Sequence, residues 1–189
     1  IYYRNLEKSG VKIFGLRAKL ISANKIELAD GKTFSSRVIL IATGSQPFVP
    51  NFIGKEYAIT SNEIFSFHKL PQRLLIVGGG YIASEFSSIF NGMGVSVTQV
   101  YRGDKLLRGF DNDIREHLTS SMRDRGVDVK CGLEVDMCEK TPSDLSVVLS
   151  DGSIIRTDCL LFATGRKPNS LNLGLEETGV EVDAEGAVR

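Results

Sequence analysis

Two apolar segments, separated by a glycine-rich turn and a helical pattern, are the clearest feature of the hydrophobic and polar positions along the chain. Leu74–Val77 is a continuous run of large aliphatic residues, and three glycines, Gly78–Gly80, follow it directly. Residues 81–93 then predict a helix that ends at Gly94, and residues 95–101 predict a second strand. Together these parts occupy about 28 residues, which is close to the length of a strand–helix–strand unit with parallel strands.

The pattern on either side of this unit predicts further elements. Residues 60–63 (TSNE) resemble a helix start with its capping residues, and this short helix should end near Pro71. Beyond the unit, the pattern predicts in order a helix at about 111–125, a strand at 127–130, a three-stranded meander at about 133–140, 145–150 and 153–157, and a strand that ends at 163–165. Alternating strands and helices of this kind indicate an α/β fold with a parallel sheet.

The glycine turn has the pattern G-x-G-x-x-A, which is typical of dinucleotide-binding proteins. Gly78 suits the tight turn, Gly80 has no side chain to block a pyrophosphate, and Ala83 is small enough for the helix to pack on the sheet. The start of the helix offers free N–H groups and a partial positive charge to phosphates. By itself the motif is also compatible with a simple glycine turn. Its place between a strand and a helix favours a Rossmann-like NAD(P)-binding domain.

The residues after the second strand bear on the choice between NADH and NADPH. An NAD enzyme usually has Asp or Glu near this point, where it binds the adenosine ribose. Here Arg102 stands where a ribose 2′-phosphate would lie, and Arg108 is near enough to be a second arm. A guanidinium binds phosphate with two parallel hydrogen bonds. Asp104 lies past the expected strand end, so we predict NADPH; the alternative is two solvated surface arginines.

A repeated pattern occurs at two places in the chain. Residues 24–47 and 145–168 align without a gap, and eight of the 24 positions are identical, including a contiguous Ala-Thr-Gly. Each copy has an Asp-Gly pair between alternating strands, which is a strong hairpin signal, and then an apolar run. We therefore expect each copy to form a hairpin, a buried strand (about 38–42 and 159–163) and a sharp exit at Ala-Thr-Gly.

The two exits divide the chain into three segments. Residues 46–164 contain the whole strand–helix–strand unit and are expected to form the NADPH-binding domain. Residues 1–45 and 165–189 are expected to be two parts of another domain, because an isolated tail of strands cannot build its own core. We expect the chain to be a fragment of a longer protein.

Composition and charge exclude several classes of function for this chain. The chain has 23 basic and 23 acidic side chains, so it has no electrostatic footprint for nucleic acid or an anionic membrane. No apolar run approaches the ~20 residues of a membrane-spanning helix, and the start lacks a signal-peptide layout. The three cysteines (Cys131, Cys138 and Cys159) are too few and too irregularly spaced for a disulfide framework, which indicates a reducing compartment. We expect a cytoplasmic protein with no metal site.

These features together resemble the FAD-dependent pyridine-nucleotide–disulfide oxidoreductases, and the glutathione reductases most closely. The resemblance rests on the Ala-Thr-Gly signatures at 42–44 and 163–165, on residues 78–85 (GGGYIASE), on residues 101–111 (YRGDKLLRGFD) and on residues 165–169 (GRKPN). It covers nearly the full chain. Trypanothione reductases share much of the 101–111 segment, so that segment does not separate the two families.

The resemblance implies roles for particular residues. Tyr81 matches a tyrosine that shields the flavin until nicotinamide displaces it, and Glu85 matches a glutamate near the nicotinamide, paired with a lysine outside this chain. The alternatives are an aromatic ring packed on the sheet and a solvated carboxylate. The residues implied to bind NADPH are Gly78, Gly79, Gly80, Tyr81, Ile82, Ala83, Glu85, Arg102, Arg108 and Gly165, and those implied to contact FAD are Ala18, Thr43 and Gly44. By the same resemblance, residues 1–45 and 165–189 would be pieces of a FAD-binding domain.

The catalytic centre of such an enzyme is not found in these residues. Two cysteines four residues apart, the FAD-binding glycine fingerprint and the C-terminal catalytic histidine are absent from the sequence. We expect the full-length enzyme, a homodimer formed through a C-terminal domain, to reduce glutathione disulfide with NADPH through FAD and a redox-active disulfide. Alternatives are trypanothione or another NADPH-dependent disulfide reductase, and, in a different class, a non-catalytic redox-sensing dinucleotide module. A lipoamide dehydrogenase fits less well, because an NAD enzyme would prefer an acid near Tyr101.

Overall fold

The computed structural model describes all 189 residues, which divide into two compact units. One unit comprises residues 46–166 and contains the glycine turn. The other comprises residues 1–45 and 167–189, two segments that are far apart in the sequence. Two short strands, β4 (Ser45–Pro47) and β13 (Arg166–Pro168), pair where the chain crosses between the units.

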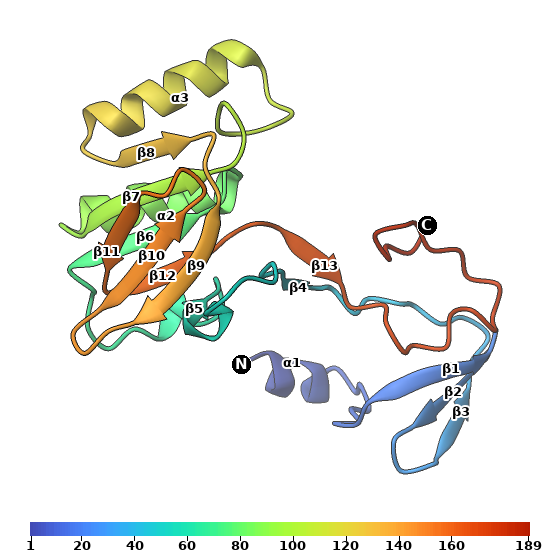
Figure 1. Cartoon of the computed structure of the whole chain (residues 1–189). Coiled ribbons are helices and arrows are strands. Elements are labelled where there is room, and N and C mark those ends of the chain that lie inside the picture. The colour runs from blue at the N-terminus through green and yellow to red at the C-terminus, as the bar shows by residue number, and fades with distance from the viewer. The chain divides into compact units, whose positions relative to one another are not determined.

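Five parallel strands form the central sheet of the 46–166 unit (Figure 1). They pair in the order β5-β12-β6-β7-β8, and each neighbouring pair is parallel. The α/β fold class is thereby confirmed. The elements along the sheet and its helices are η1 (Lys55–Tyr57), β5 (Ala58–Ile59), η2 (Ile64–Ser66), β6 (Arg73–Val77), α2 (Tyr81–Gly92), β7 (Ser96–Tyr101), α3 (Asn112–Asp124), β8 (Asp128–Cys131) and β12 (Cys159–Phe162).

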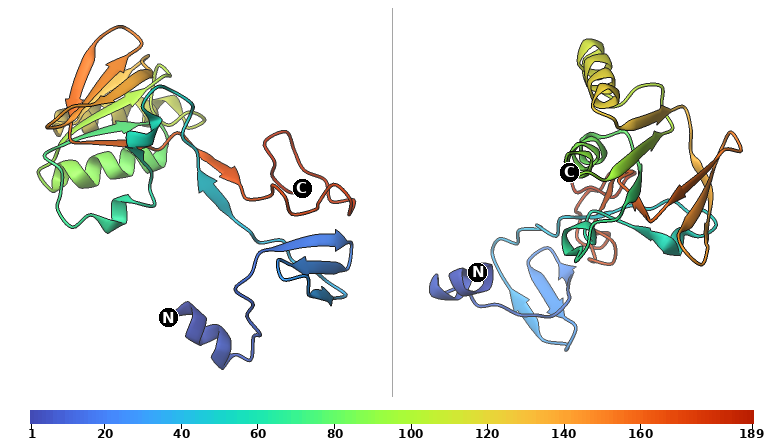
Figure 2. Two further views of the ribbon diagram at one scale, coloured as in Figure 1. Left: turned by 60° about the horizontal axis from the view of Figure 1, so that its bottom comes forward. Right: turned by 90° about the vertical axis from the view of Figure 1, so that its left-hand side faces the viewer.

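The central strand β6 is apolar throughout its interior because both faces of the sheet are covered. Leu74 and Ile76 pack in a core with residues of α2 and α3, whereas Leu75 and Val77 pack in a second core against the meander. The meander is an antiparallel sheet of β9 (Val135–Lys140), β10 (Leu145–Leu149) and β11 (Ile154–Thr157). Figure 2 shows α2 and the meander on opposite faces of the sheet. A continuous run of large aliphatic residues is what a strand buried on both faces requires.

The helix α2 ends where the glycine pattern predicts. Gly94 has φ +84°, a left-handed conformation that few other residues adopt readily, and its N–H donates to the Asn91 carbonyl. The N–H of Val95 donates back to the Phe90 carbonyl, which closes the helix end. The strand–helix–strand unit, the second helix and the meander all form close to their predicted bounds.

The second unit has its own small core and few regular elements. It contains α1 (Tyr2–Lys8), an antiparallel sheet of β1 (Ala18–Ser22), β2 (Lys25–Leu28) and β3 (Thr33–Ser35), and irregular segments. Leu20, Leu173 and Leu175 form the buried cluster, so residues from both ends of the chain meet in it. The predicted hairpin at the first Asp-Gly pair is present as β2 and β3.

Two predictions of local structure were wrong. The helix expected from Thr60 to about Leu70 is only the 3-10 turn η2, although the Glu63 carboxylate does accept hydrogen bonds from the N–H and hydroxyl of Thr60. Pro71 disfavours a helical conformation at Leu70, which shortens the space available for a helix. The strand expected at 38–42 is also absent, and Val38 and Leu40 are 75% and 85% exposed. No other strand of the chain pairs with that segment, so its backbone gains nothing from an extended ladder.

Candidate dinucleotide-binding site

The order of the parallel strands reverses direction at β6. From β6 the chain moves to β7 and β8 on one side, and it returns as β12 on the other. Ligands of open parallel sheets bind outside the carboxyl ends of the strands at such a reversal. Gly78 follows β6 directly, and Gly165 lies three residues beyond β12. Two glycines that the sequence singled out therefore follow the two strands that flank the reversal.

Gly78 is required by the packing of the turn. Its φ is +146°, and a Cβ atom at this position would lie 2.3 Å from the carbonyl oxygen of Ala163. Its N–H donates to the Val100 carbonyl (2.9 Å), and its own carbonyl accepts from the Gln99 amide, which is fully buried (2.9 Å). Both hydrogen bonds fix the turn to β7, and the close approach of the Ala163 carbonyl leaves no room for a side chain at Gly78.

Gly79 and Gly80 lack side chains for different reasons. A Cβ on Gly79 would lie 2.4 Å from the ring of Tyr101, and one on Gly103 would lie 2.5 Å from the same ring. The Tyr101 ring therefore occupies the space beside both glycines. Above Gly80, by contrast, nothing lies within 4 Å of an added Cβ. Gly80 leaves open space at the mouth of the turn, which is the space a pyrophosphate would need.

The start of α2 faces this open space without a cap. Gly80 is the N-cap residue, so no side chain accepts a hydrogen bond from the first N–H groups, and the first turn contains no acidic residue. Ala83 is fully buried and lies 3.3 Å from the position that a Cβ on Gly78 would take. The close contact between α2 and the turn thus depends on a small residue at position 83. An uncapped helix start with free N–H groups is a suitable site for an anion.

Tyr81 and Glu85 lie one turn apart on the solvent side of α2. Tyr81 is 60% exposed, and Glu85 is exposed and has no ion-pair partner within the chain. Ile82 is half-buried between this face and the sheet. The packing of Tyr81 on the sheet, which was one alternative, does not occur in this unit.

The two candidate phosphate-binding arginines lie on the loop after β7. The Arg102 side chain is 71% exposed, and its Nη1 is 3.8 Å from Oε1 of Glu134. Arg108 is exposed as well. Between them, Leu106 is fully buried in the core beneath α2 and α3. The loop is therefore anchored in its middle, while both guanidinium groups remain accessible to a ligand.

Arg115, which the sequence did not single out, holds this loop from α3. Its Nε donates to the Leu106 carbonyl (2.8 Å) and its Nη2 to the Lys105 carbonyl (2.7 Å). Lys105 in turn pairs with Glu116 of the same helix. Arg115 belongs to no recognisable sequence motif, so only its contacts in the structure reveal that it holds the loop.

The residues expected to contact FAD lie in the other unit. Ala18 begins β1 and is half-buried. The carbonyls of Thr43 and Gly44 accept hydrogen bonds from the side chain (3.1 Å) and the main chain (2.9 Å) of Asn169. Gly44 has φ +67°, so the exit after the first repeat copy depends on glycine. The N-terminal and C-terminal segments of this unit are joined at these residues.

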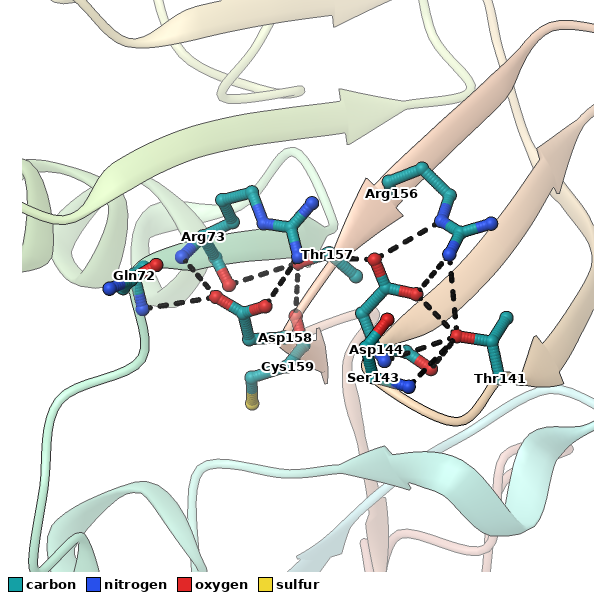
Figure 3. Close-up of polar contacts among 9 residues, drawn as sticks. All are labelled: Gln72, Arg73, Thr141, Ser143, Asp144, Arg156, Thr157, Asp158 and Cys159. Atoms are coloured by element: carbon teal, nitrogen blue, oxygen red, sulfur yellow. Dashed lines mark hydrogen bonds and ion pairs between the residues drawn. The ribbon is translucent and has the colours of Figure 1, made fainter.

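A second polar cluster lies at the opposite, amino edge of the sheet (Figure 3). Arg73, the first residue of β6, bridges Asp158 (2.6 Å) and Asp144 (3.1 Å), and Arg156 donates to the same Asp144. The Asp144 side chain is only 7% exposed, and the hydrogen bonds from Arg156 and Thr141 lower its pKa from 3.8 to about 2. We call Arg73, Thr141, Asp144, Arg156 and Asp158 the amino-edge cluster. All its charges have partners, so its role is to join the meander to the sheet.

The cysteines have the properties of packed core residues. Burial raises the pKa of Cys159 to about 12, and burial also raises the pKa values of Cys131 and Cys138. None of the three is in a disulfide. A thiol that stays protonated is a poor nucleophile, so none of them is suited to redox chemistry. No group of three or more His, Cys, Asp or Glu residues is placed to bind a metal ion. None of the helices combines the length and the apolar character that a membrane-spanning helix needs.

A fold of this kind, with an open glycine turn at the strand reversal, is typical of dinucleotide-binding proteins of the Rossmann type. Residues 2–189 match the family model described as pyridine nucleotide-disulphide oxidoreductase. The chain belongs to this family, as the sequence motifs predicted.

Individual relatives and solved structures show which members of the family the chain is similar to. The chain is 42% identical to the glutathione reductase of Burkholderia cepacia, with 100% of the chain and 42% of the relative covered. It is 39% identical to the chloroplastic/mitochondrial glutathione reductase of Pisum sativum, with 100% and 34% covered. The HOCl-induced flavoprotein disulfide reductase RclA of Escherichia coli matches with a TM-score of 0.90 and 28% identity, over 99% of this chain and 44% of that one. The chain thus spans less than half the length of each of these proteins.

Proposed function

We propose that the chain is the NADPH-binding part, with adjoining flavin-binding segments, of a flavoprotein disulfide reductase whose substrate is glutathione disulfide. The observation that carries the proposal is the open space over Gly80 at an uncapped helix start, together with two exposed arginines on the neighbouring loop. The first feature suits a pyrophosphate, and the second suits a 2′-phosphate. The glutathione reductases among the relatives support the choice of substrate.

Each proposed residue has a definite task in this function. The N–H groups at the start of α2 would bind the pyrophosphate, and Arg102 and Arg108 would bind the 2′-phosphate. Tyr81 and Glu85, on the exposed face of α2, would lie toward the nicotinamide and the flavin, with Gly165 beside them. When bound, NADPH would supply a hydride and FAD would accept it. The task of this chain is to bind the donor and to orient it.

The flavin-binding assignment concerns the second unit. Ala18, Thr43 and Gly44 would contact FAD, and the unit formed by 1–45 and 167–189 would be part of the flavin-binding domain. The support is that the N-terminal and C-terminal segments, far apart in the sequence, form one unit and are joined by the hydrogen bonds from Asn169 to Thr43 and Gly44. We further expect the protein to act in the cytoplasm and as a homodimer.

The test is NADPH oxidation by the protein at its natural length, followed through the absorbance of the reduced nicotinamide. We expect rapid oxidation with glutathione disulfide, and little with trypanothione disulfide or with NADH as donor. The control without a disulfide should be slow. Preference for trypanothione disulfide would change the substrate, and the absence of oxidation with any disulfide in a flavin-loaded protein would contradict the proposal.

A further inference from the structure

We propose that Arg115 is a positioning residue for cofactor selection, because it fixes the loop carrying Arg102 and Arg108 against the glycine turn. The inference rests on the proposed function, since it assigns the discrimination of NADPH from NADH to a residue that does not itself reach the phosphate. It assigns to α3 a task beyond covering the sheet.

The contacts of Arg115 are directed at the backbone of the loop. Its side chain is only 14% exposed, and two of its nitrogens donate to the consecutive carbonyls of Lys105 (2.7 Å) and Leu106 (2.8 Å). A weaker contact joins Nη2 to the Asp104 carboxylate at 3.4 Å. A planar guanidinium with donors in fixed directions sets the orientation of two successive peptide groups, which a lysine cannot do.

One peptide group links Arg115 to the glycine turn. The carbonyl of the Leu106–Leu107 peptide accepts from Arg115 Nε, and the N–H of the same peptide donates to the Gly79 carbonyl at 2.6 Å. In a trans peptide these two groups point in opposite directions, so the planar unit spans the space between α3 and the turn. This peptide group thereby keeps the expected pyrophosphate site and the expected 2′-phosphate site at a fixed distance from each other.

The conformation of Leu107 shows that the loop depends on such bonds. Leu107 has φ +54°, a left-handed conformation that is unfavourable for a residue with a branched side chain. Its side chain is nevertheless buried. The two hydrogen bonds of the Leu106–Leu107 peptide and the burial of both leucines hold the backbone in this state. Without Arg115, the loop loses one of these two hydrogen bonds and also the bond to the Lys105 carbonyl, which together oppose its relaxation.

Arg123 offers a matched control on the same helix. It also donates to a backbone carbonyl, that of Val129 at 3.0 Å, but this bond leads to β8 and not to the loop. If Arg115 acts only by stabilising α3, then Arg115→Met and Arg123→Met should have similar consequences. If Arg115 positions the loop, only its removal should change the choice of cofactor.

The test compares the affinities for NADP⁺ and NAD⁺ by calorimetry in the protein at its natural length, where the oxidised cofactors permit no hydride transfer. Arg115→Met should raise the Kd of NADP⁺ by about 10-fold, as expected for the loss of one well-placed phosphate contact, and that of NAD⁺ by less than about twofold. Arg115→Lys should lie between, and Arg123→Met should leave the ratio unchanged. Hydrogen exchange at the Leu107 amide of the cofactor-free protein should become faster in Arg115→Met alone.

The outcomes separate this inference from the proposed function. If the unmutated protein prefers NADP⁺ and Arg115→Met keeps the same preference, the inference is overturned and the proposed function still stands. Equal losses for both cofactors, or equal effects of Arg115→Met and Arg123→Met, also overturn it. An unmutated protein without preference contradicts the proposed function, and the role of Arg115 in cofactor selection with it. If Arg115→Met does not fold, the ratio of the two Kd values in Arg115→Lys decides the question, and a ratio equal to that of the unmutated protein overturns the inference.

Discussion

The two edges of the parallel sheet differ in how completely their polar groups are paired. At the amino edge, the guanidinium groups of Arg73 and Arg156 hold the carboxylates of Asp144 and Asp158. At the carboxyl edge, the start of α2 is uncapped, the space over Gly80 is open, and Arg108 is exposed. Paired polar groups join layers of the fold, whereas free N–H groups and an exposed guanidinium beside an open space are suited to an anionic ligand. In the proposed function, the polar groups of the amino edge serve stability and those of the carboxyl edge serve cofactor binding.

The largest expected effect is a loss of NADP⁺ affinity on substitution of Gly80, whereas substitution of Gly78 in the same turn should affect stability. Gly80→Val should weaken binding of NADP⁺ by about 100-fold or more, because its side chain would occupy the space of the pyrophosphate, while the fold remains intact. The control, Gly78→Ala, should instead destabilise the folded state, because φ is +146° and the new Cβ would lie 2.3 Å from a carbonyl oxygen. Calorimetry and thermal unfolding of both variants test this. Normal affinity in Gly80→Val would show that the open space is not the pyrophosphate site.

The pH dependence of the melting temperature tests the stabilising role of Asp144 at the amino edge. The pKa of Asp144 is lowered from 3.8 to about 2 by hydrogen bonds, chiefly from Arg156. A carboxyl with a lowered pKa in the folded state contributes stability that is present in full above pH 4 and is lost as the pH falls toward 2. Asp144→Asn should therefore lower the melting temperature by a few degrees at pH 7, and the difference should shrink between about pH 4 and pH 2.

Cofactor affinity supplies the control for that experiment. Asp144 lies at the edge opposite to the proposed site, so Asp144→Asn should change the Kd of NADP⁺ by less than about twofold. A difference in melting temperature that stays constant with pH would contradict the assigned role of the carboxylate. A large loss of affinity would contradict the division of tasks between the two edges.

The smallest expected effect concerns Glu134, the ion-pair partner of Arg102. The pair is exposed and its atoms are 3.8 Å apart, so it is weak, yet it competes with a phosphate for the guanidinium. Glu134→Gln should tighten NADP⁺ binding by about two- to fivefold and leave NAD⁺ binding unchanged. Titrations at low salt would show the effect best, and a loss of NADP⁺ affinity would mean that Glu134 supports Arg102 rather than competing with it.

The regular elements near the glycine turn were predictable from the sequence because local signals and packing agree there. The apolar run at 74–77 lies between two neighbouring strands, and Gly94 adopts the left-handed conformation that its position indicates. The two repeat copies show where this agreement fails. Residues 159–162 form β12 between β5 and β6, but residues 38–42, with a similar pattern, have no neighbouring strand and form none. An apolar run specifies a strand only where another strand is present to pair with it.

The candidate site was predictable in its motif residues and not in their supports. Gly78, Gly80 and Ala83 have the packing environment that the fingerprint implies. Tyr101, which fills the space beside Gly79, and Arg115, which holds the loop, were missed. Their tasks depend on contacts between elements that no spacing along the chain reveals.

The most direct test of the account is the ratio of the Kd values for NAD⁺ and NADP⁺, measured by calorimetry at one salt concentration. Losing one charge-assisted phosphate contact costs roughly 1.5–3 kcal/mol, or about 10- to 150-fold in affinity. The unmutated protein should therefore prefer NADP⁺ by at least about 10-fold, and Arg102→Ala combined with Arg108→Ala should bring the ratio close to one with NAD⁺ binding nearly intact. Equal affinities in the unmutated protein, or a preference that survives the double substitution, would contradict the account.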